Sequence, residues 1–264
     1  MTETKPPPAS IRPAASIVIV RDGKSGLEVF VLERHNAKGV AFAGATVFPG
    51  GKVDAPDATA EWEELAPGTP ANPERRFWIA AVRETFEEAG LLLARPASGG
   101  PLVGSDIVKR LVAEVRPPEP QGNIADFAGL LRREKLKLAV DEMVHFGHWI
   151  TPVWAPKRFD THFFLTAAPR DQLVALDAAE SAEGVWRTPG RVLDETREGK
   201  RTMVAVTKFT LELLASWPDT ATALAAARKR RVVTVLPTME KTAAGKMLKI
   251  PREAGYLTSE LAVE

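Results

Sequence analysis

Short apolar runs dominate the start and the middle of the chain, and helical spacing dominates the stretches between and after them. Residues 14–20 are apolar and β-branched, and residues 27–32 follow the turn-forming pair Asp22-Gly23, so the two runs predict a β-hairpin. Similar runs predict further strands at residues 45–48, 144–152, 159–167, 185–186, 232–236 and 247–250. Helices are expected at residues 105–115, 123–135, 202–216 and 220–231, and from Gly190 onward.

One further helix is predicted over residues 73–89, and residues that commonly begin and end helices stand at its two ends. Asn72 is expected to cap the first turn, Pro73 suits the first helical position, and Gly90 stands where a left-handed residue ends a helix. At about 100° per residue, one face of this helix gathers apolar side chains that should pack on a core, namely those of Ile79, Val82, Phe86 and Ala89.

The opposite face of the same helix gathers three carboxylates, those of Glu84, Glu87 and Glu88, and Arg83 stands four residues before Glu87 and can pair with it. Like charges so close repel each other, and a divalent cation would reverse that repulsion. The donors are hard oxygens and the chain has no cysteine, which favours Mg²⁺ or Mn²⁺ over zinc or iron. Upstream, Gly50 and Gly51 allow a sharp turn that brings a backbone carbonyl, that of Gly50, close to a metal or a phosphate.

Composition narrows the classes of protein that fit. The chain has 264 residues, 45% of them apolar, which suits one large domain or a domain with a small appendage. A formal charge of +1 gives no general attraction to nucleic acid or to anionic membranes, and no apolar run approaches the roughly 18 residues of a membrane span. Without cysteine there is no disulfide and no thiol catalysis. The cytoplasm is the default compartment for such a composition. The chain ends Leu261-Ala262-Val263-Glu264, which is not a peroxisomal address.

The sequence Phe48-Pro49-Gly50-Gly51, the acidic Asp57 and the run from Arg83 to Leu91 together resemble the Nudix box. Two departures are plain: Asp57 stands where that family usually has Glu, and residues 58–82 separate it from Arg83 where the family pattern has seven residues. Among Nudix proteins the likeness is greatest to the peroxisomal CoA diphosphatase branch, and it extends through Thr151-Pro152 and residues 158–161. The resemblance implies an α+β fold, a Nudix-type α/β/α sandwich with a mixed sheet.

With this resemblance the chain divides into three segments. Residues 1–13 are expected to form a flexible arm, residues 14–236 the Nudix hydrolase domain, and residues 237–264 a C-terminal extension that packs on it. Insertions are expected at residues 58–72, as a short helix and loop on the surface, and at residues 100–140, as a helical lid or substrate-selecting insert. A homodimer is the assembly that is expected if the chain associates with itself.

The expected metal ligands are Glu84, Glu87, Glu88 and the Gly50 carbonyl. The resemblance adds a fourth carboxylate from a loop before the closing helix, where Glu180 fits better than Glu183, although a solvated glutamate remains the alternative. The catalytic set is then Glu84 or Glu180 as base, with Arg83. Substrate contacts are expected from Arg34, Gly51 and Arg158, with a solvated arginine as the alternative for Arg34. The spacing of His145, His148 and His162 matches no metal motif, so structural roles are expected for all three.

The resemblance implies a Mg²⁺- or Mn²⁺-dependent hydrolase that cleaves a diphosphate linkage in a small nucleoside diphosphate derivative. CoA or acyl-CoA is the first hypothesis for the substrate. The second keeps the chemistry but changes the substrate to ADP-ribose, NADH, a nucleotide sugar or a dinucleotide. The third is a non-catalytic nucleotide-binding sensor, against which the three intact glutamates argue.

Overall fold

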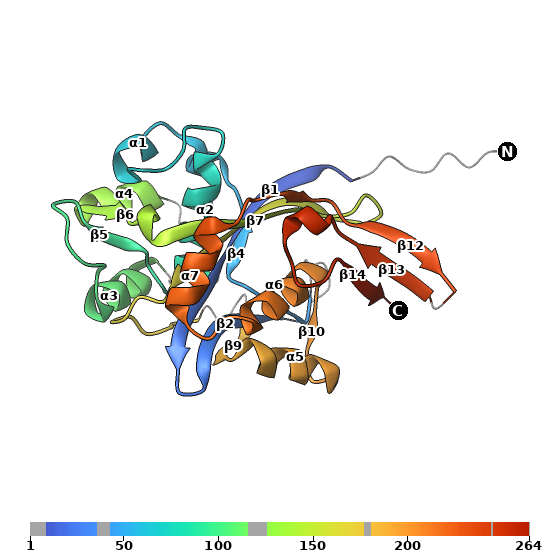
Figure 1. Cartoon of the computed structure of the whole chain (residues 1–264). Coiled ribbons are helices and arrows are strands. Elements are labelled where there is room, and N and C mark those ends of the chain that lie inside the picture. Colours follow the sequence, from blue (N-terminus) through green and yellow to red (C-terminus); the bar gives the residue numbers. More distant parts are fainter. Residues whose placement is uncertain (1–8, 36–42, 116–125, 177–180, 244, 264) are drawn as a thin grey trace.

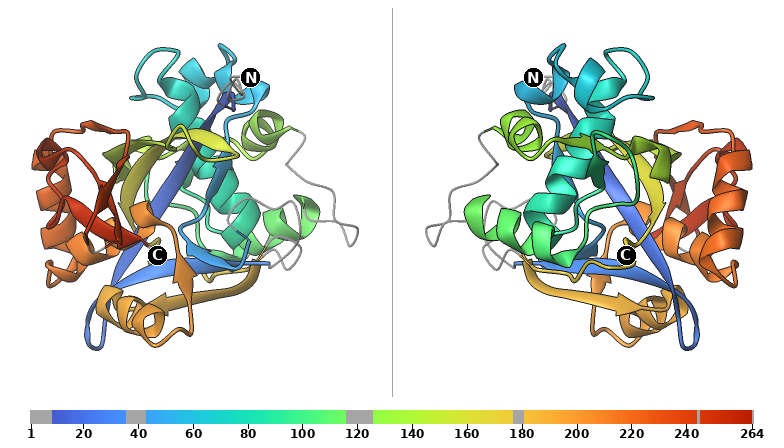
Figure 2. Two further views of the ribbon diagram at one scale, coloured as in Figure 1. Left: turned by 90° about the vertical axis from the view of Figure 1, so that its right-hand side faces the viewer. Right: turned by 90° about the vertical axis from the view of Figure 1, so that its left-hand side faces the viewer.

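The structure is a computed structural model that describes residues 9–35, 43–115, 126–176, 181–243 and 245–263. Within these ranges a mixed β-sheet runs through the middle of the molecule and helices cover both of its faces (Figure 1). Views from the two sides show the blue and yellow strands between a green helical layer and an orange and red layer (Figure 2). The α+β class expected from the sequence is confirmed.

The described part of the central sheet has nine strands, and β1 lies in its middle. Seven strands follow one another in the order β10-β3-β2-β1-β8-β7-β11, while β4 pairs with β1 and β9 with β2. The strands are β1 (Ile11–Gly23), β2 (Gly26–Arg34), β3 (Ala45–Val47), β4 (Gly50–Lys52), β7 (Met143–Ile150), β8 (Arg158–Ala167), β9 (Ser181–Arg187), β10 (Thr202–Met203) and β11 (Thr234–Val235).

The sheet divides along β1. Near its C-terminal end β1 pairs with β2, from Val20 opposite Val29 to Gly23 opposite Gly26. Nearer its start, the same edge of β1 pairs instead with β4, where Ser16 lies opposite Gly50. The other edge pairs with β8 along its length, from Ile11 to Val20. The change of partner opens the sheet between β1 and β2 and places the glycine pair in the opening.

Helices lie along both faces of the sheet, and no helix in the described ranges is long and apolar enough to cross a membrane. Their bounds are α1 (Trp62–Leu65), α2 (Arg75–Ala89), α3 (Ser105–Val115), α4 (Phe127–Arg133), α5 (Pro189–Arg197), α6 (Ala205–Ala215) and α7 (Thr220–Lys229). Short 3-10 turns are η1 (Ala55–Ala58), η2 (Val140–Glu142) and η3 (Arg252–Ala254). Two small sheets complete the fold, one of β5 (Ala94–Pro96) and β6 (Leu136–Leu138), the other of β12 (Thr238–Thr242), β13 (Gly245–Lys249) and β14 (Glu260–Val263).

Two hydrophobic cores hold these layers together. The first joins the sheet to α2, α3 and α4, and Phe86 of α2 and Phe164 of β8 are both fully buried in it. The second joins the other face to α6, α7 and the C-terminal sheet, with Phe163 and Phe209 inside. Phe163 and Phe164 are neighbours in sequence and enter different cores, because successive side chains of a strand point to opposite faces.

The start of the chain and the start of the main helix differ from expectation. The strand begins at Ile11, so residues 11–13 belong to the sheet rather than to a loose arm, because they pair with β8. Asn72 does not cap α2, since its side-chain amide donates to the Ala58 carbonyl at 3.0 Å, and the helix begins two residues after Pro73. Gly90 ends α2 in the left-handed conformation, with φ of 63°, as predicted.

Three further differences come from long-range packing. Trp62, in the segment expected on the surface, is buried against Phe127 of α4, with ring centroids 5.9 Å apart. Strands β5 and β6 are additional to the predicted elements, and each forms by pairing with the other across the segment that contains α3 and α4. The helix expected over residues 220–231 ends at Lys229, and Arg230 donates to the carbonyls of Gly255 and Ala254, each at 2.7 Å, which ties the C-terminal segment to the domain.

Candidate active site

Helix α2 places its acidic face at the opening of the sheet. Glu84 and Glu88 are buried, with 7% and 1% of their surfaces exposed, while Glu87 is partly exposed. Buried carboxylates need partners, because an isolated charge in a low-dielectric interior is strongly unfavourable. Each of the three accepts hydrogen bonds. Arg83 donates to Glu84 and Glu87, and the Gly50 N–H and Arg34 donate to Glu88.

The Gly50-Gly51 turn touches both β1 and α2. The backbone N–H of Gly50 donates to Glu88 Oε2 at 2.7 Å, and its carbonyl accepts a 3.3 Å hydrogen bond from Arg34 Nη2. A Cβ at Gly50, where φ is 150°, would lie 2.3 Å from the Ala15 carbonyl, and one at Gly51 would lie 2.2 Å from Glu84 Oε2. Both positions therefore require glycine, because any side chain would displace either the strand or the carboxylate.

Arg83 is the cation around which the acidic residues of this region gather. Its Nε and Nη2 donate to the two carboxylate oxygens of Asp57 at 3.0 and 2.9 Å, and its Nη1 donates to Glu84 and Glu87. Burial alone would lower the pKa of Arg83, but the hydrogen bonds to Asp57 and the attraction of Glu84 and Glu87 outweigh it, so the pKa rises. Arg83 therefore remains a full positive charge, and its hydrogen bonds hold these carboxylates in place.

A cavity of about 630 Å³ opens above these groups. Its acidic end contains Glu84 and Glu88 together with the glycine turn and Arg34. Asp54 adds a third carboxylate there. Glu87 does not line the cavity and lies behind it, joined to Arg83 at 2.8 Å. Five of the predicted site residues thus surround one space: Arg34, Gly50, Gly51, Glu84 and Glu88.

The remaining lining of the cavity combines basic and apolar side chains. The basic side chains are those of Arg12, Lys52 and Lys157. The apolar ones include Trp149, Phe163, Val206 and Leu248, the last from the C-terminal segment. The position of Lys157 could have been predicted from the sequence, because in an extended segment it points to the same face as Phe159, Thr161 and Phe163. Arg12 and Leu248 had none, because only the pairing of distant segments brings them to the cavity.

One predicted site residue, Arg158, is placed elsewhere. Arg158 does not line the cavity, and its buried guanidinium donates to the Thr151 carbonyl at 3.1 Å, where it holds the turn between β7 and β8. Its neighbour Lys157 takes the cavity position instead. Glu180 lies outside the described residues, and the alternative, Glu183, pairs with Arg201 at 2.9 Å. The described parts of residues 100–140 line none of the cavity, and they pack in the first core instead.

The donor set at the acidic end fits a hard divalent cation. Glu84, Glu88, Asp54 and the Gly50 carbonyl provide oxygen atoms only, which Mg²⁺ and Mn²⁺ prefer. Gly51 leaves the space beside the Glu84 carboxylate that any larger residue would fill. Glu87 is one helical turn from Arg83, so a cation would compete with the guanidinium for its oxygens.

Comparison with known proteins agrees with this geometry. A family model described as the NUDT19 Nudix domain matches residues 68–210. Acyl-coenzyme A diphosphatase NUDT19 of Gallus gallus is 30% identical over 216 residues, which cover 65% of this chain and 57% of that protein. The Homo sapiens protein of the same name is 27% identical over 237 residues, covering 73% and 59% of the two chains. The chain thus spans less than two thirds of the length of these relatives.

A solved structure shows the same fold. The crystal structure of a NUDIX hydrolase from Alicyclobacillus acidocaldarius superimposes with a TM-score of 0.67 at 26% identity, covering 82% of this chain and 96% of that one. The matched family model begins after the Gly50-Gly51 turn and Asp57, yet the folded chain brings both against the helix that lies inside the matched region. With more than half of its length matched by the model, the chain belongs to the NUDT19 Nudix domain family.

Proposed function

We propose that this chain is a Mg²⁺- or Mn²⁺-dependent diphosphatase whose substrate is CoA or an acyl-CoA. The observation that carries the proposal is the cavity itself, whose lining combines a set of oxygen donors with basic and apolar side chains. A diphosphate resists hydrolysis because its anionic oxygens repel a nucleophile, so an enzyme must neutralise them and activate water at neutral pH. Bound divalent cations supply that neutralisation and lower the pKa of water.

The residues of the chain hold the acidic end in place. Glu84, Glu88, Asp54 and the Gly50 carbonyl line the cavity and would hold the cation, and Glu87 would join them in competition with Arg83. Arg83 keeps Glu84 and Glu87 in position. A carboxylate then takes the proton from the attacking water, a role we assign to Glu84 or Glu180. The water oxygen adds to one phosphorus, the bond from that phosphorus to the bridging oxygen breaks, and the second phosphate leaves. From CoA the products are a 3′,5′-phosphorylated adenosine and a phosphopantetheine.

The walls of the cavity support a substrate with several phosphates and a long, weakly polar arm. Arg12, Lys52 and Lys157 place positive charge where phosphate oxygens would lie, and Arg34 offers its planar fork beside Glu88. Trp149, Phe163 and Leu248 offer an apolar surface for a pantetheine or acyl chain. CoA combines a diphosphate, a further phosphate and such an arm. The relatives whose names include acyl-coenzyme A diphosphatase support this choice.

The test is product analysis on a substrate panel. The chain is incubated with Mg²⁺ and, in separate reactions, CoA, an acyl-CoA, ADP-ribose, NADH, a nucleotide sugar and a diadenosine polyphosphate, and the products are identified by mass spectrometry. We expect cleavage of CoA or acyl-CoA to the two products named above. Preferred cleavage of another compound would keep the chemistry and replace the substrate. Tight binding of one compound without turnover of any would favour a nucleotide sensor.

The basic wall gives a second test within the same assay. Lys157→Met should raise KM for CoA by about tenfold, on the scale of one charge-assisted contact, with kcat little changed, because the contact is to a phosphate that does not react. Lys137→Met, on β6 away from the cavity, is the matched control. An unchanged KM in Lys157→Met would remove that residue from the substrate site.

We also propose that the chain acts in the cytoplasm, a proposal whose support is its cysteine-free composition. Cell fractionation with an antibody against the chain tests it, and recovery in a membrane-bounded organelle would contradict it. A homodimer stays a prediction, which sedimentation at several concentrations would test.

A further inference from the structure

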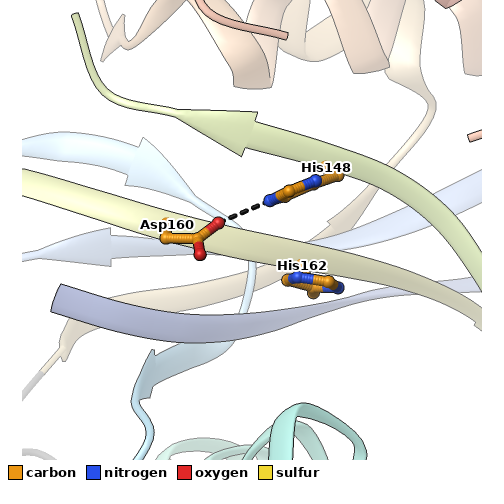
Figure 3. A group of neighbouring side chains, drawn as sticks. All are labelled: His148, Asp160 and His162. Atoms are coloured by element: carbon orange, nitrogen blue, oxygen red, sulfur yellow. Dashed lines mark hydrogen bonds and ion pairs between the residues drawn. The ribbon is translucent and has the colours of Figure 1, made fainter. Parts of the chain in front are cut away.

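A second group of metal-ligating side chains lies on the central sheet, apart from the cavity. His148, Asp160 and His162 each offer one nitrogen or oxygen atom, and these atoms all lie within 4.8 Å of one another. Figure 3 shows His148 and Asp160 pointing toward each other, with the His162 ring beside them. The His148 Nε2 to Asp160 Oδ1 distance is 2.5 Å. All three side chains are partly exposed, so an ion from solvent can reach them.

The sheet register builds this group. His148 of β7 lies directly opposite His162 of β8, and Asp160 is two residues from His162 on the same face. A bulge between His145 and Gly147 shifts the alternation of β7, so that His145 also turns to this face and stacks on His162, with ring centroids 4.9 Å apart. Simple alternation would place His145 and His148 on opposite faces. The spacing of the histidines in the sequence therefore could not reveal the group.

The group is separate from the diphosphatase site. The residues of β8 that line the cavity are Phe159, Thr161 and Phe163, whereas Asp160 and His162 alternate with them toward the other face. On that face His162 stacks on Phe77, near the start of α2, with ring centroids 3.9 Å apart. None of the three side chains lines the cavity.

The Nδ1 atom of each of the two imidazoles contacts a neighbouring polar atom. Nδ1 of His148 contacts Oγ1 of Thr234 at 2.8 Å, which leaves Nε2 facing Asp160. Nδ1 of His162 contacts Nε2 of His145 at 3.1 Å, which leaves its own Nε2 for another partner. Metal-binding histidines usually show this arrangement, in which one nitrogen binds the ion and the other is held by a neighbouring polar group.

We propose that His148, Asp160 and His162 bind a divalent cation of the zinc type. Two imidazoles and one carboxylate form a borderline donor set that suits Zn²⁺, with a water as fourth ligand, whereas the all-oxygen end of the cavity suits Mg²⁺. The ion would join β7 to β8 and, through Thr234, to β11 at the edge of the sheet.

The positive charge of Arg76 disfavours binding of a cation at His162, and its removal therefore tests the proposal. Arg76 packs over Phe77, with its guanidinium carbon 5.0 Å from the ring centroid, and its positive charge acts on His162. If an ion binds here, Arg76→Gln should tighten its binding, because it removes a like charge without touching a ligand. A surface histidine that binds zinc elsewhere on the chain would not respond in this way.

The experiment titrates the full chain, stripped of metal with a chelator, with Zn²⁺ in excess Mg²⁺, and measures binding by calorimetry. We expect one Zn²⁺ per chain at this group, and X-ray absorption of the loaded protein should show two imidazole ligands. Thr234→Val should weaken binding by about tenfold or more, as outer partners of metal ligands typically do. His162→Phe and His148→Gln should weaken it further. His35→Gln, outside the group, is the matched control.

Several results would overturn the proposal. They are no Zn²⁺ binding by the wild-type chain in excess Mg²⁺, equal affinity in wild-type and His148→Gln protein, and an absorption spectrum without imidazole ligands. Circular dichroism of the metal-free variants checks their folding. His148→Gln keeps a polar partner for Asp160, so this variant replaces His162→Phe in the test if His162→Phe does not fold. The X-ray absorption measurement uses the wild-type protein and needs no variant. Diphosphatase activity enters none of these readouts, so the two proposals stand or fall separately.

Discussion

Arg83 and Asp57 form a buried, two-pronged ion pair across the insertion that separates them in sequence. Both side chains are almost fully inaccessible, with 3% and 1% exposed, and both oxygens of Asp57 accept from the guanidinium. The same Arg83 positions Glu84 and Glu87. The shorter Asp57 thus reaches the arginine without a Glu side chain, because η1 carries its backbone close to α2.

Asp57→Asn should therefore destabilise the fold strongly. Removing one partner of a buried pair leaves an uncompensated charge, which costs about 3–5 kcal/mol. Urea denaturation measures the loss. Asp54→Asn is the comparison, since Asp54 is more exposed and lies 3.6 Å from Arg83, so its loss should cost at most about 1 kcal/mol. Equal stabilities of the two variants would show that Arg83 does not depend on Asp57.

Glu87→Gln should remove activity and leave the fold intact. The substitution keeps the size of a partly exposed side chain but removes the charge that we assign to the cation. A loss of about a hundredfold or more in kcat is expected, on the scale of other losses of transition-state charge stabilisation. Initial rates at saturating Mg²⁺, with circular dichroism as the check on folding, measure it. Glu63→Gln, on α1, is the control, and wild-type rates in Glu87→Gln would refute the ligand assignment.

Gly51→Ala should lower activity without a comparable loss of stability. The new methyl group would lie 2.2 Å from Glu84 Oε2, so the carboxylate must move out of its place at the cavity. Gly190→Ala is a matched control, because nothing lies within 4 Å of its added Cβ and the residue is in the first turn of α5. Steady-state kinetics and thermal unfolding of both variants separate the two effects. Full activity of Gly51→Ala would show that the position of Glu84 is not needed for hydrolysis.

Acid should weaken the fold partly through Glu195. Hydrogen bonds from Arg201 and the charges of Arg201 and Arg191 hold the pKa of the buried Glu195 below its ordinary value. The folded chain thus keeps Glu195 ionised at a pH where the unfolded chain already binds a proton. Its contribution is present above the ordinary carboxyl pKa, about 4.3, and is lost as the pH falls through the lowered value.

Free energies of unfolding from pH 7 to pH 3 test this. Glu195→Gln should be less stable than wild type at neutral pH, and the difference should shrink as the pH falls. Glu253→Gln, an exposed residue of η3, should follow the wild-type curve. A difference between Glu195→Gln and wild type that stays constant across this range would exclude ionisation of Glu195 as its cause.

Local patterns in the sequence predicted the elements that carry the site. Spacing at 3.6 residues per turn placed Glu84 and Glu88 on the opposite face of α2 from Phe86 and Ala89, and Gly90 ends the helix as expected. The glycine pair was predicted from its conformational freedom. Atoms of Ala15 and Glu84 lie where the Cβ of a larger residue would be at Gly50 and Gly51. These features follow from rotation per residue and backbone sterics, which depend only on near neighbours.

Contacts between distant segments could not be predicted in the same way. Lys157 takes the cavity position that was predicted for Arg158, because the pairing of β8 decides which of the two faces the cavity. The bulge in β7 brings together three histidines whose spacing carried no signal.

The sequence by itself determined a helix with one apolar and one acidic face and a turn open enough to meet it, because helix rotation and glycine sterics are local. Only the tertiary structure decided which charges surround the cavity and which histidines meet, because strand register and the packing of distant segments set those distances.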